Sequence, residues 1–425
     1  MILNVGEIRS ALLGLANQYP GLATLITLPE RTYEGQESYA LLIGTGASLI
    51  STVARCPAAG VFITSGMHGR EWGGPDICIY FAADLLEAYT LGTDLTYGGK
   101  TFSASVVRHI VERVHVVVFP CVNPDGVRYS HANRYALWRK NRNPASSVST
   151  NPNSIGVDVC RNFDFLWDYK AAFAPAAIWD GLASDSPASN QFHGTAAFSE
   201  PETKNVRWLL EQFPQIHRYL DLHSFSGFVV YPWGDDENQF TDVSQNFTNS
   251  GWNRKRGTLG GPYGEYMLWC DRRDFRKLAR AVSDAIAAVR GTVYAPHQLF
   301  LMPTPGRATY ATSGVSFDWA HSRNLIDRTK RMVRAFGIEF NTTRKFDITY
   351  DELVQIAPEV SAGLMRLCES AVPVVSLPPI LCRGFGFIRE ILPRRLWNRY
   401  GWWGRVQQAA GAVLEFITAP FESRR

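Results

Sequence analysis

Short apolar runs rich in β-branched residues alternate along the chain with longer segments whose apolar residues follow a helical period. This alternation is typical of an open, mostly parallel sheet that helices cover. We therefore predict an α/β fold with a mixed, mostly parallel open sheet and helices on both of its faces. A chain of 425 residues with 46% hydrophobic content can bury a large core and still carry an appendage.

Residue patterns place the elements of this fold. The predicted strands are Tyr39–Ile43, Val61–Thr64, Val114–Phe119, Arg218–Leu222, Phe228–Tyr231 and Ala335–Phe340. The predicted helices are an amphipathic one at the N-terminus, Pro75–Tyr89, Glu200–Gln212, Phe275–Val289 and Tyr350–Leu367. The segment Phe275–Val289 has the clearest helical pattern, because its apolar residues recur at spacings of three, four and seven.

Charge is distributed unevenly along the chain. Lys and Arg total 43 against 39 Asp and Glu, an excess too small and too dispersed to predict nucleic acid as a partner. Residues 371–425, however, hold 8 Arg, no Lys and 3 Glu, which leaves the first 370 residues with 35 basic and 36 acidic side chains. We therefore predict a near-neutral main domain, large enough for an enzyme, over residues 1–370 and a basic, aromatic-rich extension over residues 371–425.

The C-terminal extension admits two interpretations. Arg394, Arg395 and Arg399 alternate with Trp397 and other aromatic residues, a mixture that can contact an anionic membrane surface or a partner. An apolar stripe at helical spacing near the end of the chain instead favours a helical extension packed on the main domain. The apolar run 371–382 contains three prolines and about 12 residues, so we predict no transmembrane segment.

Compartment is indicated only indirectly. The N-terminus lacks the basic start and unbroken apolar core of a signal peptide, and the seven cysteines form no CxxC pair. Both observations fit reduced thiols in a cytoplasmic protein, whereas a leader outside this sequence would make the protein secreted.

Two segments at predicted strand ends carry candidate metal ligands. His68 and Glu71 are three residues apart in Gly66–Trp72, directly after an apolar strand, and His223 closes the strand of Leu220–Ser224. Two imidazoles, one carboxylate and an open water position form a common catalytic zinc site. Each segment alone also fits an ordinary loop pair or a buried histidine, because motifs this short often arise without function.

Further segments follow in a characteristic order, and together they resemble the zinc carboxypeptidases of the carboxypeptidase A type. The similarity extends from about residue 15 to residue 345. The segments that carry it, beyond the two above, are Asn123–Gly126, Leu137–Arg142, Gly156–Phe163, Tyr310–Trp319 and Gly337–Phe340.

The resemblance implies a set of functional residues. His68, Glu71 and His223 would bind one Zn²⁺ per chain, and Asp158 would orient the first histidine through its other ring nitrogen. Glu339 matches the general base that takes a proton from the attacking water. The alternative for Glu339 is an ordinary carboxylate at the end of a strand.

Substrate-binding residues follow from the same resemblance. Arg139 matches the arginine that faces the oxyanion, and Arg161 matches the one that clamps the terminal carboxylate of the substrate. Arg70 matches an auxiliary carboxylate-binding position, and Tyr310 matches the loop tyrosine that closes over bound substrate. The alternatives are a solvated basic face for Arg139, a structural role for Arg70 and a packed loop position for Tyr310.

Two positions bear on affinity and specificity. Cys160 stands where the family usually has Asn before the clamping arginine, and a thiol is a weak donor, so we expect weaker binding of the terminal carboxylate. Cys160 could also act as a redox group or as an incidental metal ligand. Phe317 matches the base of the specificity pocket, where an apolar side chain disfavours basic substrates.

The chain is therefore predicted to be a zinc-dependent metallocarboxypeptidase that hydrolyses the C-terminal bond of peptides or proteins, with preference for apolar or aromatic C-terminal residues. A related zinc amidase or endopeptidase acting on modified or cell-wall peptides is one alternative, because Cys160 weakens the carboxylate site. A zinc-containing binding protein without turnover is the other.

Overall fold

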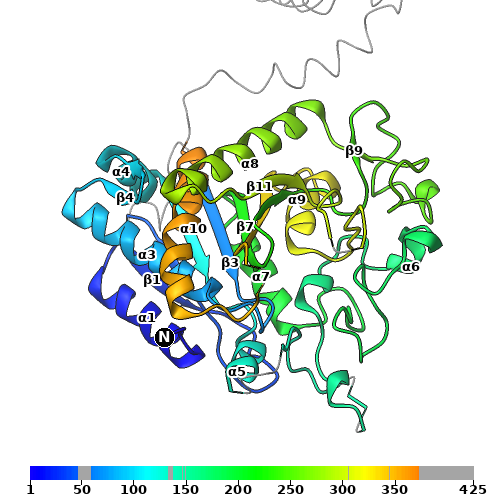
Figure 1. Ribbon diagram of the computed structural model, residues 1–425, viewed down its shortest axis with the longest axis horizontal. Coiled ribbons are helices and arrows are strands. Elements are labelled where there is room, and N and C mark those ends of the chain that lie inside the picture. Colours follow the sequence, from blue (N-terminus) through cyan, green and yellow to red (C-terminus); the bar gives the residue numbers. More distant parts are fainter. Residues whose placement is uncertain are drawn as a thin grey trace, which may run out of the picture. The chain divides into compact units, whose positions relative to one another are not determined.

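An eight-stranded mixed sheet forms the centre of the computed structural model, which describes residues 1–45, 59–132, 137–145, 147–148, 150–304, 306–343 and 345–372 (Figure 1). The strand order is β1-β2-β6-β3-β7-β12-β8-β11. The pairs β6/β3, β3/β7, β7/β12 and β8/β11 are parallel, and the other three are antiparallel. The bounds of these strands are β1 Ala23–Thr27, β2 Tyr39–Ile43, β3 Ala59–Ser65, β6 Val114–Phe119, β7 Ile216–Ser224, β8 Phe228–Tyr231, β11 Ala295–Gln298 and β12 Arg334–Phe340.

Two small hairpin-sized sheets lie outside the main one. Their strands are β4 Leu95–Tyr97 with β5 Lys100–Phe102, and β9 Asn238–Gln239 with β10 Glu265–Tyr266. The helices are α1 Val5–Gln18, α3 Gly74–Leu91, α4 Ala104–Arg113, α5 Pro124–Ala132, α6 Tyr169–Ala172, α7 Pro201–Gln212, α8 Trp269–Arg290, α9 Ser316–Ile326 and α10 Tyr350–Ala371.

Local sequence explains where several helices begin and end. α1 and α10 each start with a capping box, in which the cap side chain accepts a backbone N–H while a Glu three residues later reaches back. The caps are Asn4 with Glu7, and Thr349 with Glu352. α3 ends at Leu91 and is capped by Gly92 in the left-handed conformation, which glycine adopts without steric penalty. The sequence therefore sets these boundaries with little help from tertiary contacts.

Helices cover both faces of the sheet, as the sequence predicted. α10 packs against both α3 and α8 on one face, while α9 packs on the opposite face against β7 and β12 (Figure 1). The alternation of side chains along β7 separates the two faces: Leu220 and Leu222 point to the α10 side, and Asp221 bonds Ser316 at the start of α9.

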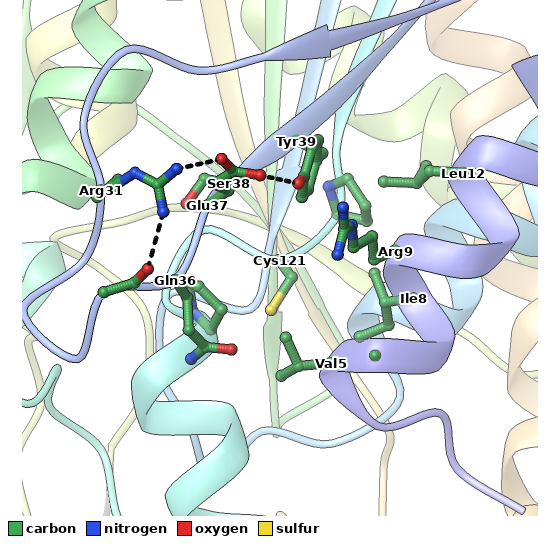
Figure 2. A pocket seen from close by; sticks show the side chains of 14 residues that line it. Val5, Ile8, Arg9, Leu12, Arg31, Gln36, Glu37, Ser38, Tyr39 and Cys121 are labelled. Atoms are coloured by element: carbon green, nitrogen blue, oxygen red, sulfur yellow. Dashed lines mark hydrogen bonds and ion pairs between the residues drawn. The ribbon is translucent and has the colours of Figure 1, made fainter.

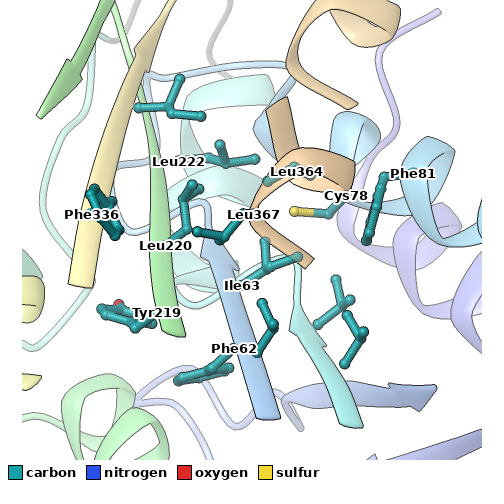
Figure 3. Close-up of a cluster of buried hydrophobic side chains, with 14 of the residues drawn as sticks. Phe62, Ile63, Cys78, Phe81, Tyr219, Leu220, Leu222, Phe336, Leu364 and Leu367 are labelled. Carbon is teal, nitrogen blue, oxygen red and sulfur yellow. The ribbon is translucent and has the colours of Figure 1, made fainter. Parts of the chain in front are cut away.

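The core on the α10 side is closely packed and apolar. Ile63 of β3, Leu220 of β7, Leu364 and Leu367 of α10 and Phe81 of α3 are each fully buried and lie together (Figure 3). Burying one side chain of this size contributes about 1.5–3 kcal/mol. The core thereby fixes the neighbouring strands, whose ends carry the polar residues described below.

The chain divides into two units, Met1–Pro373 and Val374–Arg425, and the second lies wholly outside the described residues. The helical extension expected over residues 371–425 therefore lies, apart from its first two residues, outside the described part of the chain. The domain boundary at residue 370 stays a prediction. Within the described ranges, none of the helices is long and apolar enough to cross a membrane.

Candidate active site

The carboxyl ends of β3, β7 and β12 meet at one edge of the sheet, where open α/β folds collect their functional groups. His68 and Glu71 lie in the loop after β3, His223 lies at the end of β7, and Glu339 lies near the end of β12. The loop after β3 is held close to the chain near α5. A Cβ atom on Gly69 would lie 2.3 Å from the carbonyl oxygen of Gly126, so only glycine allows this approach.

His68, Glu71 and His223 point their ligand atoms at one another. Nδ1 of His68 lies 2.7 Å from Oε1 of Glu71, and Nδ1 of His223 lies 3.0 Å from Oε2 of the same carboxylate. The two Nδ1 atoms are 3.2 Å apart. Burial opposes the charge on Glu71, but the two imidazoles outweigh it and hold the pKa of Glu71 well below its usual range. The three side chains predicted to bind metal are therefore brought together.

The opposite nitrogen of each histidine faces a buried carboxylate. Nε2 of His68 lies 3.2 Å from Oδ1 of Asp158, and Nε2 of His223 lies 2.9 Å from Oδ2 of Asp221. Both aspartates are 0% exposed. A carboxylate at Nε2 favours the tautomer that carries its proton there, which leaves the Nδ1 lone pair available to a metal ion.

Asp221 is a residue that the sequence analysis missed. Its two oxygens also accept hydrogen bonds from Thr64 Oγ1 at 2.8 Å and from Ser316 Oγ at 2.7 Å, so the carboxylate is held in place from two elements. The signal was present, because Asp221 and His223 are two apart on one strand and so share a face.

Cys160 offers a competing set of donors. One ligand atom each from His68, Cys160 and His223 lie within 4.8 Å of one another, and Sγ of Cys160 is 3.6 Å from Nε2 of His223. The nearest sulfur partner is Sδ of Met67 at 3.2 Å. Because the Nε2 atoms already face Asp158 and Asp221, the Nδ1 side with Glu71 is the better metal site, and Cys160 lies behind it.

The converging donors fit zinc. Two neutral imidazole nitrogens and one carboxylate oxygen are the ligands of many catalytic zinc sites, which keep a fourth position for water. All three side chains are at most 6% exposed, so they are fixed before any metal arrives. The donor set and its convergence therefore agree with the predicted site.

Glu339 lies beside the metal-ligand cluster without joining it. In the parallel pairing of β12 with β7, Glu339 is the register partner of His223. Burial, the largest influence, raises the pKa of Glu339 to about 7. A carboxylate with this pKa can exchange a proton with water near neutral pH.

Two arginines lie close to this cluster. Arg139 donates from Nε to Oδ2 of Asp158 at 2.8 Å, and its Nη1 is 3.9 Å from Oε1 of Glu71. Arg70 places its guanidinium 4.1 Å from the centre of the Phe346 ring. Arg139 is thus fixed by the carboxylate that orients His68, whereas Arg70 is positioned by an aromatic face.

Arg161 and Tyr310 are bonded to each other. Nη2 of Arg161 donates to the Tyr310 hydroxyl at 3.0 Å. Nε, Nη1 and Nη2 of Arg161 also donate to the backbone carbonyls of Leu182, Cys160 and Gly181, respectively, at 2.7–2.8 Å. The guanidinium is thus held rigidly, and the tyrosine oxygen occupies a place that a substrate oxygen could take.

The predicted residues line one cavity of about 200 Å³, apart from Asp158, which lies behind His68. Phe317 is part of the lining and is 3% exposed. The lining predicted from the sequence is His68, Arg70, Glu71, Arg139, Cys160, Arg161, His223, Tyr310, Phe317 and Glu339. Sequence reasoning missed Ser224, whose backbone N–H donates to Oε2 of Glu71 at 3.2 Å, and Phe346 beside Arg70.

A larger cavity of about 400 Å³ lies between α1 and the loop before β2 (Figure 2). Ile8 and Leu12 of α1 give it an apolar wall, and Arg31 and Tyr39 in its lining both donate hydrogen bonds to Glu37. Among the described residues, its lining contains no histidine, and Glu37, the carboxylate there, is already paired. Size alone therefore does not identify the site, and the smaller cavity carries the chemistry.

The sequence is similar to those of known zinc carboxypeptidases. The family model described as zinc carboxypeptidase matches residues 8–362. Carboxypeptidase B of Astacus astacus is 30% identical over 315 residues, which cover 74% of this chain and 80% of that protein. Carboxypeptidase A1 of Bos taurus is 25% identical over 357 residues, covering 84% of this chain and 66% of that protein.

A solved structure supports the fold. The carboxypeptidase A from Helicoverpa armigera superposes with a TM-score of 0.64 at 20% identity, covering 88% of this chain and 74% of that one. At this identity the likeness concerns the fold alone.

Proposed function

The chain belongs to the zinc carboxypeptidase family of peptide hydrolases, and on that basis we propose that it is a metal-dependent exopeptidase that removes the C-terminal residue of a peptide. The observation that carries this proposal is the convergence of the His68 and His223 Nδ1 atoms on the two oxygens of Glu71. These three side chains would hold one Zn²⁺ per chain.

The protein side of the reaction can be assigned to individual groups. Zinc, when bound, supplies a Lewis acid and lowers the pKa of water to about 7. Glu339 accepts the proton of the attacking water and delivers it to the leaving amine. Asp158 and Asp221 hold the Nε2 protons, so that both histidines keep Nδ1 free. Arg139, held by Asp158, presents a fixed positive charge to the oxyanion.

The proposal assigns substrate recognition to the rest of the cavity. Arg161 binds the terminal carboxylate, which replaces the Tyr310 hydroxyl as a partner, and Tyr310 then closes over the substrate. Arg70 supplies a second positive charge in the cavity lining. Phe317 lines the pocket for the terminal side chain, and we propose that apolar and aromatic residues are preferred there.

Cys160 is the departure that bears on affinity. Its Sγ faces Met67 and His223, so no side-chain amide from this position reaches the substrate carboxylate. A hydrogen bond to a charged group contributes about 1.5–3 kcal/mol. Binding of the free carboxylate should therefore be weaker than in a relative that has Asn here, while the charge of Arg161 is retained.

A metal-exchange experiment tests the proposed chemistry. A chelator should abolish release of the C-terminal residue from an N-acylated peptide, and stoichiometric zinc should restore it. Cleavage that persists in protein shown to be metal-free would overturn the proposal.

One observation favours a second candidate, a zinc amidase or endopeptidase. Each of the three guanidinium nitrogens of Arg161 already donates to a backbone carbonyl, and one also donates to the Tyr310 hydroxyl. Cys160 adds no side-chain amide for a substrate carboxylate. An enzyme of this kind would not need a free carboxylate, so the two candidates differ in their requirement for the substrate terminus.

A further inference from the structure

A group of exposed cations lies at the edge of the sheet opposite the active site. We call this group the basic edge and define it by seven exposed side chains, which come from α8 and from the loop between α9 and β12. They are Arg273, Arg276, Lys277, Arg280, Arg328, Lys330 and Arg331.

Hydrogen bonds place the two contributing segments side by side. Arg334, the first residue of β12, donates to Oδ1 of Asp271 at 3.1 Å and to Oδ2 of Asp274 at 3.0 Å, both on α8. Arg331 donates to the carbonyl of Gln215 at 3.2 Å, directly before β7. The basic edge therefore lies at the amino ends of β7 and β12, whereas His223 and Glu339 lie near their carboxyl ends.

The charge excess at the basic edge is local. Residues 269–280 and 327–334 together hold nine basic and three acidic side chains, although the first 370 residues are near neutral. Of the acids, Asp271 bonds Arg334, Asp274 bonds both Arg334 and Arg273, and Asp327 faces Lys330 at 3.9 Å. These positive charges also act on His217. Burial, the largest influence, and then the charges of Arg218, Arg331 and Arg334 lower the pKa of His217 to about 3.

Large apolar side chains are exposed among these cations. Trp269 at the start of α8 is 51% exposed, with the Arg273 guanidinium 5.2 Å from its ring centre. Ile326 at the end of α9 is 63% exposed and stands two residues before Arg328. Aromatic and aliphatic groups that project between Lys and Arg are typical of surfaces that bind anionic lipid, because the apolar groups enter the headgroup region.

The chain leaves the described unit at the same edge. Nη2 of Arg218, near the start of β7, donates to the carbonyl of Ser370 at 3.3 Å, one residue before α10 ends. The 55 residues that follow from position 371 contain 8 Arg against 3 Glu, with Trp397, Trp402 and Trp403. The composition of the continuing chain thus has the same character as the edge from which it continues.

We propose that the basic edge binds an anionic phospholipid surface. Charge complementarity supplies the attraction, and Trp269 and Ile326 supply apolar contacts that a nucleic-acid backbone would not use. The cavity at the opposite edge of the sheet would then face away from the lipid. This inference does not depend on the proposed peptidase activity.

Vesicle co-sedimentation of the full-length chain tests the proposal. The test variant combines Arg276→Gln, Lys277→Gln and Arg280→Gln on the exposed face of α8. The matched control combines Arg31→Gln, Arg128→Gln and Lys345→Gln, exposed cations by the active-site edge that remove the same charge. Thermal unfolding of each variant should match the unmodified protein, because the substituted side chains are exposed.

We expect binding to phosphatidylserine-containing vesicles and none to pure phosphatidylcholine. Each cation near such a surface contributes about fivefold in affinity, so the test variant should bind on the order of 100-fold more weakly, while the control stays close to the unmodified protein. Equal weakening of both variants, or undiminished binding by the test variant, would overturn the proposal. Binding to a DNA duplex without binding to the anionic vesicles would also overturn it, in favour of a polyanion partner.

Discussion

Nε2 of His223 lies 2.9 Å from Oδ2 of Asp221, a carboxylate that Thr64 and Ser316 also bond. The aspartate therefore fixes both the ring orientation and the tautomer of a proposed zinc ligand. Groups in this position typically change metal affinity by about 10–100-fold when they are replaced.

Replacement of Asp221 by Asn should weaken zinc binding within that range, because a neutral amide is a poorer acceptor for the Nε2 proton. Competition with a chromophoric chelator measures the dissociation constant directly. Ser316→Ala is the matched control, since it removes one hydrogen bond to Asp221 but leaves the carboxylate in place. Equal zinc affinity in Asp221→Asn and the unmodified protein would show that Asp221 does not orient His223.

Glu339→Gln should lower kcat by about 100- to 10,000-fold, the usual contribution of a general base. Zinc content should not change, because Glu339 lies beside the ligands rather than among them. Metal analysis of the same sample separates the two effects. Loss of zinc together with activity would mean that Glu339 is a ligand.

The rate should also depend on pH through Glu339. Burial raises the pKa of Glu339 to about 7 in the protein without metal, and a nearby cation lowers it. Because the base must be ionised, kcat/KM should rise with pH between about 4.3 and 7. A profile that is flat across this interval would contradict the assignment of Glu339 as the base.

Substitution of Phe317 by Asp should change the preferred C-terminal residue. The side chain lines the cavity, so a carboxylate there would attract the positive charge of a basic C-terminal side chain. The measurement is kcat/KM for peptides ending in Phe, Leu and Lys. The unmodified protein should prefer Phe or Leu and the variant Lys; fastest cleavage of Lys by the unmodified protein would remove the specificity proposal.

A buried carboxylate outside the lining of the proposed active site should limit stability at high pH. Burial, and then the charge of Glu200, raises the pKa of Glu202 to about 8. A carboxyl whose pKa is higher in the folded state favours folding below its unfolded pKa and loses that contribution as pH rises through about 8.

Glu202→Gln should therefore be more stable than the unmodified protein at pH values above about 8, by an amount on the order of a few kcal/mol. The Gln oxygen can keep the hydrogen bond from Asn141. Urea unfolding at a series of pH values gives the difference in free energy of unfolding. A difference that does not grow with pH would contradict the raised pKa.

The sequence predicted those parts of the fold that local pattern controls. The strands over 114–119 and 228–231 have the predicted bounds, and the helix predicted over 275–289 lies inside α8. β11, with the sequence Ala-Pro-His-Gln, was missed because it has no apolar run and owes its conformation to pairing with β8. Edge strands of this kind depend on a neighbour that only the folded chain supplies.

The candidate site divides in the same way. These four residues, His68, Glu71, His223 and Glu339, lie at or just after the ends of apolar strands, so their convergence could be anticipated from the order of strands and loops. Two of the partners of Arg161 could not, because they are the backbone carbonyls of Gly181 and Leu182, about 20 residues away, whose positions depend on loop packing. Orientation of Cys160 toward Met67 was likewise a result of tertiary contacts.

The most direct test of the account compares two N-acylated peptides ending in Phe, one with a free terminal carboxylate and one amidated, each with and without a chelator. We expect chelator-sensitive cleavage of the free-acid peptide alone, and loss of that preference in Arg161→Gln. Comparable cleavage of both peptides by the unmodified protein would contradict carboxylate recognition and support the amidase or endopeptidase candidate. Failure of the zinc-loaded protein to cleave either peptide would contradict the proposed exopeptidase activity on apolar C-termini.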